Sequence, residues 1–343
     1  MDIALASTAR PEARKEREPD AVSALTALLS EDIARADALI LDRIGSSVPL
    51  IPAVAQHLIG SGGKRLRPLV ALAAARLFGY AGAGHVKLAA AVELIHTATL
   101  LHDDVVDASA LRRGRDTASL VFGNGASVLV GDFLLAQGFA VMVEADEPRA
   151  LAVLSAAAAV IAEGEVMQLA GAGDIGLTRA RYLAIVEAKT AALFAAAARA
   201  GGAVAECGDE AEATLEAFGR AFGIAFQLVD DALDYEGAAA ALGKAPGDDF
   251  REGKPTLPVV LAYGRGDAAE RAFWARAFAA PERDAADFAE AAARLRRHGA
   301  LAETRHEARR FAAGARRELS RLPASAVRDA LDRLTAFAVD RDY

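Results

Sequence analysis

The sequence predicts an all-α fold in which one domain is built around a cavity. Alanine-rich segments with only 6% aromatic residues and few β-branched runs favour helix throughout the 343 residues. Two apolar helical patterns end in the same acidic motif, DDxxD, at 103–107 and 230–234. No linker divides residues 21–343, whereas residues 1–20 mix both charges with proline and are expected to form a flexible tail.

Helical periodicity places the elements in order. A first amphipathic helix is expected over 21–44, before Pro49 and Pro52. Pro68 is expected as the first residue of a helix over 68–78. The remaining expected elements are a core helix that runs from about residue 89 into the first acidic motif, helices over 124–144, 150–170, 179–200 and 218–236, a polar loop over 237–258, and arginine-rich scaffold helices over 268–341.

Composition excludes several classes of function. The net charge of −8 argues against a general nucleic-acid surface. Cys207 is the only cysteine, which excludes an internal disulfide and is typical of a reducing cytosol. The most apolar windows are interrupted by acidic or histidine side chains, so we expect a soluble, cytoplasmic protein without a transmembrane segment. The interrupting groups are Glu93 and His96 in one window and Glu163 and Glu165 after residues 151–162.

The first acidic motif lies where a helix disfavours negative charge. Asp103 and Asp107 are four residues apart near the C-terminal end of their helix, so they share a face. The helix dipole and the free carbonyl groups are already negative at that end. Such carboxylates are expected to bind something positive, although a single DDxxD can also be a solvated acidic helix end.

The second copy of the motif favours the metal hypothesis. Asp230, Asp231 and Asp234 repeat the spacing of Asp103, Asp104 and Asp107 after another apolar helix. The simplest arrangement places the two motifs on opposite sides of a cavity. Their six carboxylates would repel one another unless Mg²⁺ joined them to a phosphate-bearing ligand.

Basic residues mark the expected phosphate sites. The stretch GSGGKRLRP at 60–68 combines glycines, cations and a helix start, and Lys64 and Arg67 are its best candidates for anion binding. The chain has only six lysines against 33 arginines, and four lysines lie in motif-like stretches. Lysine is a compact point charge suited to phosphate. These four are Lys64, Lys189, Lys244 and Lys254.

The two DDxxD motifs, together with GGKRLRP at 62–68 and LGKAPGDDFREGKPTLP at 242–258, resemble the trans-polyprenyl diphosphate synthases. The similarity extends from about residue 20 to the end and is greatest to the octaprenyl, solanesyl and decaprenyl type. It implies an antiparallel helical bundle of the isoprenoid synthase type and a homodimer. The implied reaction condenses isopentenyl diphosphate with farnesyl or geranylgeranyl diphosphate to make a quinone side chain, which would be passed to a membrane.

The resemblance also implies roles for individual residues. About three Mg²⁺ ions would be held by Asp103, Asp107 and Asp230, assisted by Asp104, Asp231 and Asp234. Isopentenyl diphosphate would contact Lys64, Arg67, His96 and Arg113. The allylic diphosphate would meet Arg112, Lys189, Thr190, Gln227, Lys244 and Lys254. Asp132, Glu163, Glu165 and Gln168 are interpreted as capping or cavity-edge polar groups.

Product length is expected to depend on the helix turn below the first motif. Ala98 and Thr99 lie five and four residues before Asp103, where a growing chain would pass, and both are small. Short-chain members of the family place an aromatic residue at this level, so the resemblance implies an open tunnel. Phe139 is a candidate for its floor.

Three alternatives remain open at this stage. A class I terpene cyclase would share the helical fold and one DDxxD motif. A non-catalytic subunit of a heteromeric synthase would be expected to lack one acidic motif. The pair His102 and Asp103 also resembles the HD phosphohydrolases, which would leave the second acidic helix unexplained.

Overall fold

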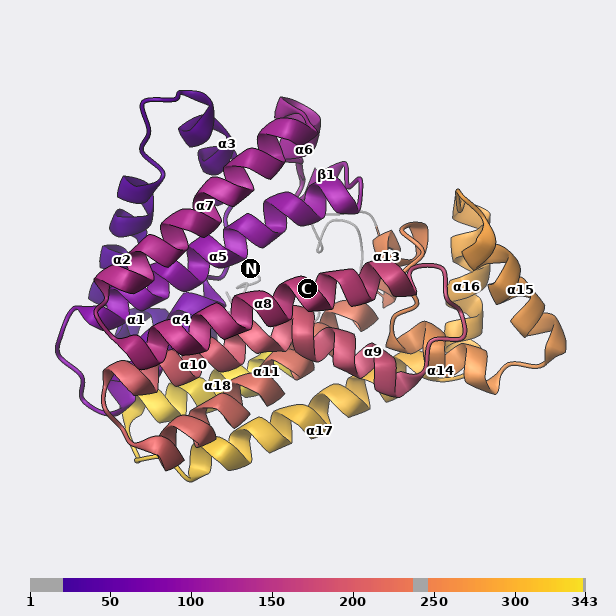
Figure 1. Cartoon of the computed structure of the whole chain (residues 1–343). Helices are drawn as coiled ribbons and strands as arrows, with labels where there is room; N and C mark the ends of the chain where they lie inside the picture. The colour runs from indigo at the N-terminus through magenta and orange to yellow at the C-terminus, as the bar shows by residue number, and fades with distance from the viewer. Residues whose placement is uncertain (1–20, 237–245, 342–343) are drawn as a thin grey trace, which may run out of the picture.

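The computed structural model describes residues 21–236 and 246–341, so the expected tail and Lys244 lie outside the described residues. Within these ranges the chain is helical apart from one two-stranded hairpin, and the predicted all-α class is confirmed (Figure 1). The elements are α1 (Ala21–Leu28), α2 (Ser30–Arg43), α3 (Leu50–Ile59), α4 (Leu66–Leu77), α5 (Gly84–Val106), β1 (Leu111–Arg112), β2 (Arg115–Asp116), α6 (Ala118–Phe122), α7 (Asn124–Glu144), α8 (Pro148–Gly171), α9 (Arg179–Val186), η1 (Glu187–Ala191), α10 (Ala192–Val204), α11 (Asp209–Glu236), α13 (Asp248–Arg251), α14 (Leu257–Arg265), α15 (Ala268–Ala279), α16 (Ala285–Arg297), α17 (Ala300–Ser320) and α18 (Ala326–Asp340).

Small residues bring the central helices close together. Helix α5 packs along α7, and α11 lies between α10 and α17 (Figure 1). A Cβ atom at Gly223 of α11 would lie 2.6 Å from the Cα atom of Ala191, so only glycine permits this approach. The close contact fixes the end of α11, and with it the second acidic motif, beside the helix that carries Lys189.

The helix expected over 179–200 is instead three segments. A π-helical turn, η1, separates α9 from α10 and carries Lys189 and Thr190. A π-turn contains an extra residue and therefore changes the direction of the side chains that follow it. Apolar periodicity alone does not reveal such a turn, because the flanking helices keep the ordinary spacing.

The N-terminal half also differs from the expected boundaries. The helix expected over 21–44 is divided into α1 and α2 at the buried residue Leu29. Helix α4 begins at Leu66 rather than at Pro68, which lies within its first turn, where a missing N–H is tolerated. Arg65 precedes this helix in the left-handed region, with φ of 48°. The reversal of the chain at this point directs the GGKR segment toward the site.

Helices α7 and α8 are long and apolar enough to cross a membrane by length and composition alone. Within their most apolar windows, 39% and 28% of the residues are buried. Core helices of soluble proteins meet the same criterion, so the finding is weak evidence for a span. Both helices leave much of their apolar surface uncovered by the rest of the chain.

Candidate active site

The two acidic motifs line one site that consists of two adjoining cavities. The larger cavity has a volume of about 830 Å³ and the smaller about 320 Å³. Both are bordered by Asp103 from α5, Lys189 from η1 and Asp231 from α11. The expected juxtaposition of two distant acidic helices is therefore present in the folded chain.

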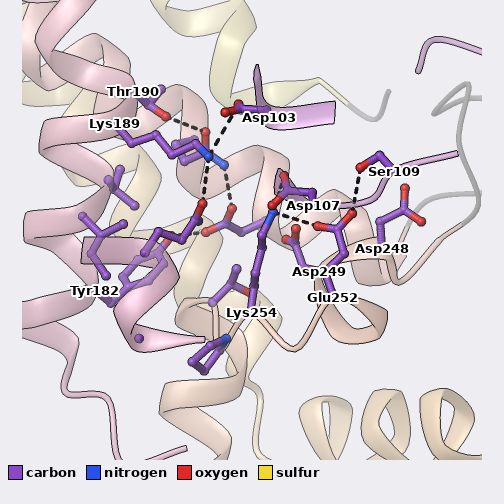
Figure 2. A pocket seen from close by; sticks show the side chains of 18 of the residues that line it. Asp103, Asp107, Ser109, Tyr182, Lys189, Thr190, Asp248, Asp249, Glu252 and Lys254 are labelled. Carbon is purple, nitrogen blue, oxygen red and sulfur yellow. Dashed lines mark hydrogen bonds and ion pairs between the residues drawn. The ribbon is translucent and has the colours of Figure 1, made fainter. Parts of the chain in front are cut away.

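The carboxylates of the first motif are paired with lysines from distant segments. The Nζ atom of Lys189 lies 3.5 Å from Asp103 Oδ2, and that of Lys254 lies 2.7 Å from Asp107 Oδ2 (Figure 2). Lys254 also lies 2.8 Å from Glu252 Oε2. Burial opposes the charge of Lys254, but these carboxylates outweigh it and raise the pKa of the lysine. The negative end of α5 is thus compensated by positive charge from other parts of the fold.

Asp104 has a different environment from its two neighbours in the motif. Its side chain is fully buried and accepts a hydrogen bond of 2.6 Å from Arg112 Nε, while its Oδ2 has no hydrogen-bond partner among the described residues. Burial raises the pKa of Asp104, and Arg112 opposes that rise. Asp104 borders neither cavity and instead holds Arg112 at the rim of both.

In the second motif, Asp230 and Asp231 border the larger cavity. Asp230 Oδ1 lies 2.5 Å from Arg341 Nη2. Asp231 accepts hydrogen bonds from Tyr182 Oη and, at 2.8 Å, from Gln227 Nε2. Burial raises the pKa of Asp231 well above its usual value. These two carboxylates differ accordingly: Asp230 is half-exposed beside a cation, and Asp231 is enclosed by hydrogen-bond donors.

Asp234 anchors the following loop. Its carboxylate accepts the backbone N–H groups of Asp248, at 3.3 Å, and Asp249, at 3.1 Å, at the start of α13. It borders neither cavity. Four of the six motif carboxylates therefore face the site, whereas Asp104 and Asp234 fix its surroundings.

The basic residues expected to bind phosphate lie together at the larger cavity. Its lining includes Lys64, Arg67, His96, Arg112 and Arg113. A Cβ atom at Gly63 would lie 2.8 Å from Arg113 Nη1, so glycine at this position lets the guanidinium rest against the loop. The cluster forms the positive wall of a cavity whose other wall is acidic.

Arg67 and His96 form the half-buried part of this positive wall. Arg67 Nη1 lies 3.1 Å from His96 Nε2, and its guanidinium lies 4.4 Å from the ring centre of Phe194. Burial lowers the pKa of Arg67 to about 10. Burial, followed by the charges of Arg67 and Arg113, lowers the pKa of His96 well below 6.5. His96 is therefore neutral at physiological pH and offers one ring nitrogen as a donor and the other as an acceptor.

Lys189 and Thr190 join the acidic and basic parts of the site. Thr190 Oγ1 donates a hydrogen bond of 2.9 Å to Gln227 Oε1, and Gln227 in turn donates to Asp231. Lys189 Nζ donates to Glu165 Oε2 at 2.6 Å and to Gln168 Oε1 at 2.7 Å. Glu165 and Gln168 were expected only as capping or edge groups, but their contacts tie them directly to Lys189.

Several residues of the site are not predicted from the sequence. Arg341 was included in the C-terminal scaffold, yet it borders the larger cavity and lies 4.0 Å from the ring centre of Phe226. No local signal marks it, because its partners lie more than a hundred residues away. Glu93 could have been found, since it lies three residues before His96 on the same helix and borders the same cavity. The other lining residues with polar side chains that were not predicted are Ser61, Arg65, Ser109, Tyr182, Asp248, Asp249, Glu252 and Thr256.

The candidate chain-length residues occupy different environments. Thr99 borders the larger cavity, and its hydroxyl donates to the His96 carbonyl at 2.8 Å. Ala98 is buried in the core, and Phe139 packs against the core while partly exposed. Neither of them borders a described cavity. Thr99 is thus the one of the three that a ligand in the larger cavity would meet.

The pair His102 and Asp103 does not form a site. His102 Nε2 contacts the Val128 carbonyl at 3.1 Å and Asp132 Oδ1 at 3.4 Å, both on α7, and does not border either cavity. Asp103 points into the site instead. The arrangement disfavours the HD phosphohydrolase alternative.

The neutral state of His96 predicts a pH dependence of stability. Because its pKa is lower in the folded chain than the usual 6.5, the unfolded chain binds the proton more readily at acidic pH. The free energy of unfolding should therefore decrease as the pH falls below 6.5, by up to about 1.4 kcal/mol per pH unit from this group. Denaturant titrations of the wild type and His96→Gln should show the smaller loss in the variant. If the free energies of unfolding of the wild type and His96→Gln fell in parallel with pH, the lowered pKa of His96 would be contradicted.

Comparison with known proteins agrees with this geometry. The family model described as polyprenyl synthetase matches residues 48–295. The chain is 49% identical to the octaprenyl diphosphate synthase of Escherichia coli over 239 residues, which covers 70% of this chain and 74% of that protein.

Two solved structures extend the similarity to the whole fold. A polyprenyl synthase from Caulobacter crescentus, complexed with calcium and isoprenyl diphosphate, is 51% identical with a TM-score of 0.91, covering 95% of this chain and all of that one. A decaprenyl diphosphate synthase from Rhodobacter capsulatus is 48% identical with a TM-score of 0.89, covering 94% and 99%. The chain belongs to the polyprenyl synthetase family, as its motifs predicted, and is a prenyltransferase of the long-chain trans-polyprenyl diphosphate synthase group.

Proposed function

We propose that this protein condenses isopentenyl diphosphate with an allylic diphosphate, farnesyl or geranylgeranyl, to make an octaprenyl to decaprenyl product. The observation that carries the proposal is the pair of acidic helix ends and the basic cluster around one divided cavity. Such a site has separate surfaces for a metal-bound diphosphate and for a second diphosphate. The octaprenyl and decaprenyl relatives support a long product. Its proposed use is as a quinone side chain.

Mg²⁺ is the proposed cofactor, with about three ions held by Asp103, Asp107 and Asp230. These carboxylates supply the hard oxygen ligands that Mg²⁺ prefers. Each of them forms an ion pair with a lysine or arginine, so positive charge stabilises all three positions. No group of three or more His, Cys, Asp or Glu side chains in the described ranges could hold a metal alone. Mg²⁺ commonly takes many of its ligands from water and substrate phosphate. When bound, the ions would stabilise the departing diphosphate.

The chain's own residues would bind and orient the two substrates. Lys64, Arg67 and Arg113 would bind the isopentenyl diphosphate, with neutral His96 as an additional donor. Lys189 and Thr190 would contact the allylic oxygen that departs, and Lys254, with Lys244 from outside the described residues, would cover that diphosphate.

The reaction breaks one bond and forms another without an external oxidant. The allylic C–O bond breaks, the double bond of isopentenyl diphosphate attacks the allylic carbon, and a proton leaves the product. The released diphosphate would accept that proton.

Two other functions make different predictions. A class I terpene cyclase needs no second diphosphate site, so the basic cluster at Lys64 and Arg67 favours the synthase. A subunit that is inactive alone would fail to turn over when purified without a partner. Incorporation of labelled isopentenyl diphosphate by the purified chain separates the synthase from both.

Substitution of a proposed metal ligand should abolish most of the activity. Asp103→Ala removes a cavity-lining carboxylate and should reduce kcat by at least about a hundredfold, because metal-based stabilisation of the leaving group is lost. The measurement is the rate of isopentenyl incorporation, with circular dichroism as the check on folding. Asp42→Ala on α2, an exposed carboxylate, is the matched control. Near-normal turnover by Asp103→Ala would refute the assignment.

Product length should respond differently at two adjacent positions. Thr99→Phe places a ring in the larger cavity and should shorten the product by several isoprene units. Ala98→Phe instead adds volume to a closed core and should mainly destabilise the fold, by about 1–3 kcal/mol. Reversed-phase chromatography of products primed with farnesyl diphosphate, and thermal denaturation, measure the two effects. An unchanged product from a folded Thr99→Phe variant would contradict this path.

A homodimer through α7 and α8 is also proposed. Both helices present exposed apolar side chains, among them Leu129 at 69%, Val166 at 65% and Leu169 at 63% exposure. A patch of this kind marks a surface that another molecule covers, and a second copy of the chain is the proposed occupant. The protein would then act in the cytoplasm and release its long product to a membrane.

Disruption of this face should change the mass in solution. Leu129→Asp should convert a particle of twice the chain mass into one of the single chain mass, because a carboxylate would be buried unpaired at the interface. Light scattering after size-exclusion chromatography gives the mass. Leu41→Asp, at an exposed leucine of α2, is the matched control. A wild type that is already monomeric, or that sediments with vesicles through this face, would refute the dimer.

A further inference from the structure

The ammonium group of Lys189 is held by three oxygens from two sides of the site. Glu165 Oε2 and Gln168 Oε1, both on α8, lie at 2.6 Å and 2.7 Å. Asp103 Oδ2, on α5, lies at 3.5 Å. The two α8 oxygens accept hydrogen bonds, whereas Asp103 is an ion-pair partner at the longer distance, so α8 accepts from two of the three N–H donors of the ammonium.

The contacts with α8 are closer and include the backbone. A Cβ atom at Gly164 would lie 2.7 Å from the backbone nitrogen of Lys189, so the two chain segments touch where the π-turn begins. Glu165 follows Gly164 directly, and Gln168 lies one helical turn further along. Helix α8 therefore fixes both ends of Lys189, its backbone and its ammonium.

The third contact conflicts with the proposed metal site. Asp103 cannot give the same oxygen fully to a divalent cation and to Lys189. Without the two α8 oxygens, Asp103 would be the one partner of the ammonium left among these three. The lysine would then compete with the metal for Asp103. With Glu165 and Gln168 in place, Asp103 can release Lys189 while the ammonium keeps two hydrogen bonds.

We propose that Glu165 and Gln168 are positioning residues: they keep the Lys189 ammonium on the α8 side of the site, so that Asp103 can exchange its ion pair with Lys189 for a divalent cation while Lys189 points at the allylic diphosphate. The inference rests on the proposed function for the identity of the metal and the diphosphate. The part concerning Lys189 rests only on the contacts of α8 and η1. Glu165 and Gln168 act here through Lys189, without contact with the reacting atoms.

Two variants separate geometry from charge. Glu165→Gln removes a negative charge and weakens the hold on Lys189, whereas Gln168→Met removes an acceptor with no change in charge. Asp332→Asn is the control for charge, because it removes a carboxylate that pairs with Arg316 at 2.6 Å in the distant pair α17 and α18.

The binding readout is titration with Mg²⁺ alone, by calorimetry and by NMR of lysine labelled at ¹³Cε and ¹⁵Nζ. The chain has only six lysines, and Lys189→Arg assigns the signal. Loss of a hydrogen bond to a charged group should raise the apparent dissociation constant for Mg²⁺ about tenfold in both α8 variants. On Mg²⁺ binding, the NMR signal should show that the Lys189 side chain stays ordered in the wild type and in Asp332→Asn. In both α8 variants it should show a mobile side chain.

The kinetic readout distinguishes positioning from general damage. Both α8 variants should reduce kcat by about tenfold and leave the KM for isopentenyl diphosphate unchanged, because the residues proposed to bind that substrate are on the other wall. A parallel change in kcat, KM and stability would show a structural role and overturn the proposal. A loss confined to Glu165→Gln would show that charge alone matters, and would overturn it as well.

Failure of the proposed function gives a different result. In that case the wild type and Asp332→Asn would not incorporate isopentenyl units, yet the mobility of Lys189 in the two α8 variants would still be measured. An ordered Lys189 signal in both α8 variants would overturn the positioning role whatever the enzyme makes.

Discussion

The structure depends on the balance of charge at the ends of two helices. Helices α5 and α11 each carry three aspartates near the C-terminal end, where the helix dipole is itself unfavourable to anions. The chain compensates four of these six carboxylates with Lys189, Lys254, Arg112 and Arg341, which come from four different segments. Folding therefore collects cations from across the sequence at one place. A bound divalent cation would take over part of that compensation, and the displaced lysines and arginine would then be available to a diphosphate.

The same constraint explains why the site has distinct walls. Half-buried Arg67 and neutral His96 border the same larger cavity as Asp230 and Asp231, so the site offers both positive and negative groups to two diphosphate ligands. Asp104 and Asp234 belong to the motifs but stabilise the structure around the site. Asp104 holds Arg112, and Asp234 holds the first turn of α13. A motif of identical letters is thus divided by the fold into side chains that face the site and side chains that fix it.

Much of this was predictable from the sequence, because the decisive signals are local. Apolar periodicity predicts the observed bounds of α7, and the repeated DDxxD spacing predicts a shared cavity. The π-turn at Lys189 was not predictable, since one extra residue in a helix leaves the flanking periodicity intact. The start of α4 was misplaced because Pro68 is tolerated anywhere in a first helical turn. Arg341 was not predicted as a site residue, and Glu165 was predicted only as a capping or cavity-edge group, because packing between distant segments sets their partners.

The central claim is that both acidic motifs act on one metal-bound diphosphate. Crystals grown with Mn²⁺ and a non-hydrolysable farnesyl diphosphate analogue test it most directly, because anomalous scattering locates the ions. The account predicts ions that bridge the diphosphate to Asp103 and Asp107 on one side and to Asp230 on the other, with Lys189 still on Glu165. Ions bound to one motif alone, or a diphosphate held outside the two cavities, would contradict it.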